Sequence, residues 1–175
     1  MAKFRVIAAA ILLLSAAGCS FEPSYRLVSR ASLGLQDEPF ADHILISKSR
    51  RKLYLISNGK AFRSYDISLG FAPVGPKRRE GDGRTPEGTY LIDRRNPRSA
   101  FHLSLGISYP NAADRAAARR RGVDPGGDIF VHGQPKRNAD PDSPDWTAGC
   151  ISVTDREIEE IWVLVRDGTP ITIRP

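Results

Sequence analysis

Apolar side chains alternate with polar ones along the early part of the chain, in the pattern of half-buried strands. Residues 43–47 form one such run and residues 53–55 mark a second. Asn58-Gly59 follows, and this dipeptide is a strong hairpin signal because both of its positions adopt positive φ. Residues 62–69 then read as the returning strand. The pattern predicts an antiparallel β-meander.

Helical periodicity is confined to two short segments. Asn111 is a suitable N-cap for a helix over 112–121, which is rich in Ala and Arg and ends at Gly122. Near the end of the chain, Thr154 and Glu157 have the spacing of a capping box. Four apolar side chains then share one helical face, and a glycine is the expected stop. These residues are Ile158, Ile161, Trp162, Val165 and Gly168.

Further strands complete the predicted fold. A loop rich in Pro, Gly and charge separates the meander from them, over residues 71–87. The later strands are expected at 88–93, 101–107, 128–132 and 170–173. The chain has 175 residues, enough for one domain with a substantial core. We therefore predict a mainly β fold with two helices, a mixed sheet or sandwich, as a single domain over residues 41–175.

The N-terminus has the character of an export signal. Lys3 and Arg5 precede an apolar run that is too short to span a bilayer, and small residues lead into Cys19. This arrangement resembles the lipobox of bacterial lipoproteins, although Ala16 stands where leucine is usual. The resemblance implies a signal peptide over 1–18, a lipid on Cys19, a tether over 19–40 and a periplasmic, membrane-anchored protein. An ordinary secretory signal or an uncleaved anchor is the alternative.

Charge does little to narrow the function. The chain has 26 basic and 20 acidic residues, a net charge of +6, and its basic residues gather at 77–79, 94–98 and 119–121. Such patches attract anionic polymers, but no helix-turn-helix, zinc-finger or RNA-binding signature accompanies them. We expect no nucleic-acid partner, no cofactor and a monomer.

Cys150 is the residue best suited to nucleophilic chemistry. If Cys19 carries a lipid, Cys150 has no disulfide partner in an oxidising compartment. Gly149 before it permits a sharp turn that aims backbone N–H groups at a reacting oxygen. Ile151 and Val153 anchor it on a strand. The same pattern also fits a cysteine that is simply buried as a small apolar residue.

A cysteine nucleophile needs a base, and His132 is the best candidate among the three histidines. It ends an apolar strand, whereas His43 and His102 read as packed or surface side chains. A metal site built from Cys150, His132 and His102 is an alternative, but no Cys-x-x-Cys or His-x-x-x-His spacing supports it. We predict no metal.

Three segments together resemble the L,D-transpeptidase catalytic domain, the YkuD family, in order and spacing. They are Gly83-Arg84-Thr85-Pro86-Glu87-Gly88-Thr89-Tyr90, Ile129-Phe130-Val131-His132-Gly133 and Thr147-Ala148-Gly149-Cys150-Ile151. The resemblance covers residues 41–175 and implies a β-sandwich-like fold. It also implies attack by cysteine on a peptide stem of peptidoglycan, at the bond between diaminopimelate and D-alanine. An amine then takes the acyl group, or water hydrolyses it.

The resemblance assigns roles by position. Cys150 is the nucleophile, His132 the general base, and the carbonyl of Gly133 orients the ring, as the third member of a triad does. The N–H groups of Gly149 and Cys150 are the candidates for the oxyanion hole. Asp128 and Asp145 are side-chain alternatives for orienting His132. Arg84, Tyr109 and Trp146 are candidate substrate-binding residues, with solvent exposure for the arginine and core packing for the aromatics as alternatives.

Two positions depart from the family pattern. Ala148 replaces a second histidine, and Ser152 replaces an arginine, which leaves the choice of acceptor open. A hydrolase acting as carboxypeptidase or amidase is therefore the alternative to a transpeptidase. A wall-binding lipoprotein without turnover is a third hypothesis, which the presence of both Cys150 and His132 disfavours.

Overall fold

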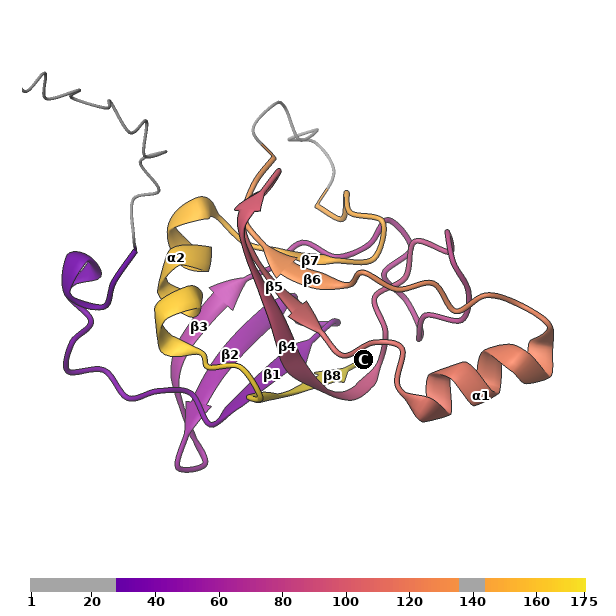
Figure 1. Ribbon diagram of the computed structural model, residues 1–175, viewed down its shortest axis with the longest axis horizontal. Coiled ribbons are helices and arrows are strands. Elements are labelled where there is room, and N and C mark those ends of the chain that lie inside the picture. Colours follow the sequence, from indigo (N-terminus) through magenta and orange to yellow (C-terminus); the bar gives the residue numbers. More distant parts are fainter. Residues whose placement is uncertain (1–27, 136–143) are drawn as a thin grey trace, which may run out of the picture.

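Strands dominate the part of the chain that the computed structural model describes, residues 28–135 and 144–175 (Figure 1). The strands of this part are β1 (His43–Ser47), β2 (Lys52–Ser57), β3 (Lys60–Asp66), β4 (Gly88–Ser99), β5 (His102–Ile107), β6 (Phe130–His132), β7 (Ile151–Ser152) and β8 (Pro170–Arg174). The helices are η1 (Ala31–Leu33), a 3-10 turn, α1 (Ala112–Arg121) and α2 (Asp155–Leu164). The predicted signal peptide, residues 1–18, and Cys19 lie outside the described residues.

The predicted meander is confirmed. Strand β2 pairs antiparallel with both β1 and β3. Asn58 and Gly59, between β2 and β3, have φ values of 51° and 73°. Positive φ at both positions is the requirement of the tight hairpin turn that the sequence predicts.

Strand β4 links two halves of the sheet, whose order is β3-β2-β1-β8-β4-β5-β6-β7. The first part of β4 pairs with β8, and the part from Ile92 onward pairs with β5 across two register shifts. The strand is longer than residues 88–93, the range that apolar alternation predicts. Residues 94–98 are mostly exposed, so backbone pairing with β5 holds them in the strand rather than burial.

A single hydrophobic core joins the two halves. Ile46 and Leu53 from one half and Leu105 and Val131 from the other are fully buried in the same cluster. Helix α2 contributes its apolar face to this cluster, and Figure 1 shows α2 and α1 at opposite sides of the molecule. The predicted mainly β fold with two helices is confirmed.

Both α-helices begin at the predicted N-caps, Asn111 and Thr154. The Asn111 side chain accepts hydrogen bonds from the N–H groups of Ala113 and Asp114, and Thr154 accepts one from Glu157. Gly122, with φ of 65°, ends α1 as expected. The predicted stop of α2 at Gly168 is wrong: the helix ends at Leu164, because buried Val165 is already extended.

The second half of the predicted tether contacts the domain. Leu35 is buried in the core cluster, and Glu38 forms an ion pair with Arg63 at 2.5 Å. The backbone N–H of Ala41 donates to the carbonyl oxygen of Leu164 at 2.9 Å. Residues 28–40 therefore lie along the folded domain rather than extending from it as a free tether.

Candidate active site

Two short parallel strands, β6 and β7, carry the predicted nucleophile and base. Val131 pairs with Ile151 and His132 pairs with Ser152. Successive side chains of a strand point to opposite faces. Val131 and Ile151 point into the core, where both are fully buried. The other face presents His132, which is 3% exposed, and Cys150, which directly precedes β7.

Cys150 and His132 line the same cavity, which has a volume of about 300 Å³. Phe101, Ser104, Asp128 and Phe130 line it as well. The Cys150 thiol is a free cysteine and lies 3.5 Å from the carbonyl oxygen of Asp128. Cys150 and His132 are 18 positions apart in the sequence. The structure brings them together because β6 and β7 are paired neighbours.

The ring of His132 is oriented by the backbone of the next residue. Its Nδ1 lies 2.7 Å from the carbonyl oxygen of Gly133. A carbonyl oxygen can only accept, so Nδ1 carries the proton and Nε2 has a free lone pair. This is the contact with Gly133 that the family resemblance predicts. A histidine held in this tautomer can take a proton through Nε2.

The two aspartates weighed as alternatives make other contacts. The Asp145 carboxylate is buried, pairs with the guanidinium of Arg51 and accepts from the N–H of Leu69 at 3.0 Å. The Asp128 side chain is 89% exposed and pairs with Arg94 at 3.1 Å. The contacts described for these side chains favour the Gly133 carbonyl as the group that orients His132.

Burial determines the protonation states of the pair. It lowers the pKa of His132, and the hydrogen bond to Gly133 offsets this only in part. Burial also raises the pKa of the Cys150 thiol above its ordinary value. Both shifts favour the uncharged forms near pH 7, a thiol beside a neutral imidazole. Such a pair reacts by moving the proton from sulfur to Nε2 as the sulfur attacks.

The turn before Cys150 depends on Gly149 and on Thr147. Gly149 has φ of 134°, and a Cβ there would lie 2.7 Å from the carbonyl oxygen of Arg84. The Thr147 hydroxyl accepts from the N–H of Gly149 at 3.1 Å and donates to the carbonyl oxygen of Cys150 at 2.7 Å. This corrects one expectation: the Gly149 N–H is already hydrogen-bonded within the protein. The Cys150 N–H therefore stays the candidate donor for the oxyanion hole.

Two aromatic rings flank His132. The centroid of Phe101 lies 4.5 Å from that of His132, and the centroid of Trp146 lies 5.7 Å from it at a steep angle. The structure therefore places the Trp146 ring beside His132, and its role in substrate binding stays a prediction. Phe101 was missed, because it lies on the β4–β5 turn and only the fold brings that turn against β6.

Tyr109 and Arg84 do not line this cavity. Tyr109 is 4% exposed, packs edge-on against Tyr90 and donates through its hydroxyl to Pro125 at 2.9 Å. Its predicted role as a wall of the Cys150 pocket is not supported, and core packing describes it better. Arg84 contacts the Cys150 turn through its backbone carbonyl, next to Gly149, and is one of the residues that line a second cavity.

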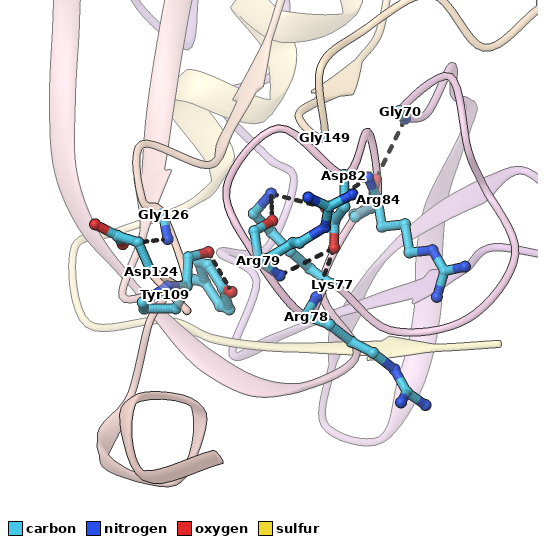
Figure 2. Close-up of polar contacts among 12 residues, drawn as sticks. Gly70, Lys77, Arg78, Arg79, Asp82, Arg84, Tyr109, Asp124, Gly126 and Gly149 are labelled. Atoms are coloured by element: carbon cyan, nitrogen blue, oxygen red, sulfur yellow. Dashed lines mark hydrogen bonds and ion pairs between the residues drawn. The ribbon is translucent and has the colours of Figure 1, made fainter. Parts of the chain in front are cut away.

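The loop that carries Arg84 is held in place by internal contacts. The Asp82 carboxylate accepts from the N–H groups of Arg78 and Arg84, at 2.7 and 3.2 Å, and from Lys77 Nζ at 3.0 Å. Figure 2 shows these groups gathered around Asp82, with Gly149 close by. The side chain of Lys48, 3% exposed, pairs with Glu87 and also donates to the carbonyl oxygen of Thr85. The loop therefore forms a fixed wall beside the turn.

Within residues 28–135 and 144–175, no group of three His, Cys, Asp or Glu side chains is placed to hold a metal ion. His102 instead pairs with Glu159 at 2.8 Å. No helix in the described part of the chain is long and apolar enough to cross a membrane.

Comparison with known proteins agrees with this geometry. The family model of the YkuD L,D-transpeptidase catalytic domain matches residues 41–173. The chain belongs to the YkuD family. YafK of Escherichia coli strain K12, provisionally named an L,D-transpeptidase, is 32% identical to this YkuD domain over 129 residues, which cover 70% of this chain and 46% of YafK.

Solved structures show the same fold. Pgp2 of Campylobacter jejuni, described as a helical cell shape determining protein, has a TM-score of 0.60 at 26% identity, over 75% of this chain and 46% of Pgp2. Bd1075 of Bdellovibrio bacteriovorus has a TM-score of 0.55 at 26% identity, over 77% of this chain and 48% of Bd1075. An L,D-transpeptidase of Xylanimonas cellulosilytica, at 15% identity, has a TM-score of 0.51, over 79% of this chain and 62% of that one. The chain thus spans about half the length of YafK, Pgp2 and Bd1075.

Proposed function

We propose that this YkuD domain is a peptidoglycan L,D-transpeptidase that acts through a thioester on Cys150. The observation that carries the proposal is the pairing of β6 with β7. It places Cys150 and His132 at one cavity, with the Nδ1 of His132 bound to the Gly133 carbonyl. The substrate is the peptide stem, at the bond between diaminopimelate and the terminal D-alanine.

In the first half-reaction the thiol proton moves to Nε2 of His132 as the sulfur attacks the carbonyl carbon of that bond. The N–H of Cys150 stabilises the oxyanion of the tetrahedral intermediate. The intermediate then collapses and its carbon–nitrogen bond breaks. The leaving amine of D-alanine takes the proton from His132, and the acyl group stays on Cys150 as a thioester.

In the second half-reaction an amine of another stem attacks the thioester. His132 accepts the proton of that amine and returns it to the sulfur as the thioester breaks, so the enzyme is regenerated and a cross-link forms. Water in place of the amine would give a shortened stem instead. Ala148, two residues before Cys150, is small and exposed, which leaves room for either acceptor and keeps hydrolysis as the second candidate.

The test is product analysis with disaccharide-tetrapeptide. The full chain in detergent is incubated with this substrate, and the masses of the protein and of the products are measured by mass spectrometry. We expect a covalent adduct on Cys150 with loss of D-alanine, and a dimer that lacks one D-alanine. A tripeptide monomer without dimer would favour the hydrolase. The same products from Cys150→Ala would overturn the proposal.

We also propose that the enzyme is exported, anchored by a lipid on Cys19 after removal of residues 1–18, and monomeric. Metabolic labelling with a fatty acid tests the anchor, because Cys19→Ser should abolish the label. Label that survives this substitution would contradict the anchor and leave the catalytic proposal untouched.

A further inference from the structure

A second cavity, with a volume of about 520 Å³, lies beside the Cys150 turn and is larger than the cavity at the thiol. Three of its arginines come from the loop before β4 and one from the end of α1. These four are Arg78, Arg79, Arg84 and Arg121. The ring of Phe71, which is 61% exposed, supplies an apolar wall. We call this space the arginine cavity.

The positive charge of the arginine cavity is not neutralised from within. Asp82 is the one carboxylate among its lining residues, and Lys77 and three backbone N–H groups already bind it. Burial works to raise the pKa of Asp82, but these hydrogen bonds outweigh it and the pKa is lowered. No ion pair engages the four guanidinium groups within the described part of the chain. Figure 2 shows the side chains of Arg78 and Arg84 extending away from Asp82.

The arginine cavity adjoins the turn that presents the nucleophile. A Cβ on Gly70 would lie 2.1 Å from the carbonyl oxygen of Gly83 and 2.9 Å from the Cα of Gly149. A Cβ on Gly149 would lie 2.7 Å from the carbonyl oxygen of Arg84. The loop and the turn are therefore in backbone contact. The cavity and the turn thus share a neighbour, because Arg84 lines the cavity and its carbonyl oxygen lies against Gly149, the residue before Cys150.

We propose that the arginine cavity binds a free carboxylate of the same peptide stem that Cys150 attacks, an inference that rests on the proposed function. Guanidinium groups bind carboxylates through two parallel hydrogen bonds, and they do so most strongly where no internal anion competes. Diaminopimelate carries a second carboxylate on its side chain, and this is the group that we assign to the cavity.

The test measures binding without turnover. Full chain with Cys150→Ala is titrated calorimetrically with disaccharide-tetrapeptide, and with the same compound whose diaminopimelate side-chain carboxyl is amidated. We expect about 10-fold or weaker binding of the amidated compound. Adding Arg78→Gln and Arg121→Gln should weaken binding of the free acid by a similar factor and abolish the preference.

Arg120→Gln is the matched control, because Arg120 lies on α1 but does not line the arginine cavity. It removes one positive charge, as Arg121→Gln alone does, and should leave both affinities unchanged. Equal affinities for the two compounds would overturn the inference, as would an equal loss with Arg120→Gln. Binding of inorganic phosphate as tight as that of the tetrapeptide would also overturn it, because the cavity would then be a general anion site. Absence of a Cys150 adduct in the wild type, with the carboxylate preference intact, would overturn the proposed function instead.

Discussion

The hydroxyl of Ser152 lies 3.3 Å from the carbonyl oxygen of Gly133, the oxygen that also accepts from Nδ1 of His132. Ser152 is 1% exposed and sits opposite His132 in the β6–β7 pair. In this geometry the Ser152 hydroxyl helps to fix the Gly133 carbonyl, which in turn orients His132, the proposed base. The position at which the family pattern has an arginine thus contributes to positioning in this chain.

Replacing Ser152 by alanine should therefore slow the reaction without abolishing it. A hydrogen bond of this kind contributes about 0.5–1.5 kcal/mol, which corresponds to a fall of roughly 2- to 10-fold in kcat with little change in KM. The acid limb of the pH–rate profile should shift, because the orientation of His132 changes. Ser152→Thr should restore most of the rate. An unchanged kcat and pH profile for Ser152→Ala would show that the contact has no catalytic effect.

Alkylation of Cys150 should report its raised pKa. Burial keeps the thiol protonated near neutrality, so the rate of reaction with iodoacetamide should still be rising at pH 9. His132→Gln should lower the rate at pH 7, where the imidazole assists, and should have less effect at pH 10. An alkylation rate that stops rising below pH 8 would contradict the neutral thiol–imidazole pair.

The stability of the protein should depend on pH through His132. Its pKa is lowered from 6.5 in the folded state, so the unfolded chain takes up a proton first as the pH falls. The contribution of the neutral ring is present above pH 6.5 and is lost as the pH falls through the lowered value. The free energy of unfolding, from urea titrations between pH 7 and 5, should therefore fall more steeply for wild type than for His132→Gln. If the free energy of unfolding fell equally with pH in wild type and in His132→Gln, the lowered pKa of His132 would be contradicted.

Gly149→Ala should damage both stability and activity. A side chain at φ of 134° costs about 1–3 kcal/mol, and its Cβ would also meet the Arg84 carbonyl. Gly168 is a matched control, because it also has positive φ but has no atom within 4 Å of an added Cβ. Gly168→Ala should cost only the backbone strain and leave kcat intact. Equal effects of the two substitutions on kcat would show that the contact with Arg84 does not shape the Cys150 turn.

Local signals predicted much of the fold. The Asn58-Gly59 turn and the caps at Asn111 and Thr154 act over a few residues, and each is present as expected. The end of α2 and the second half of β4 were not predictable in this way. Val165 is as buried as the helical residues before it but has an extended backbone, and residues 94–98 are held by a neighbouring strand.

The sequence by itself determined which residues are candidates for the chemistry: a thiol after glycine, and a histidine before glycine at the end of an apolar strand. Those properties are local, because they follow from residue type and from the immediate backbone. Tertiary structure decided which groups surround them. The pairing of β6 with β7 brought Ser152 to the Gly133 carbonyl, and the Thr147 hydroxyl took the N–H of Gly149. The same folding buried Tyr109 away from the thiol and gathered Arg84 with three other arginines, because contacts between distant segments depend on packing rather than on any local pattern.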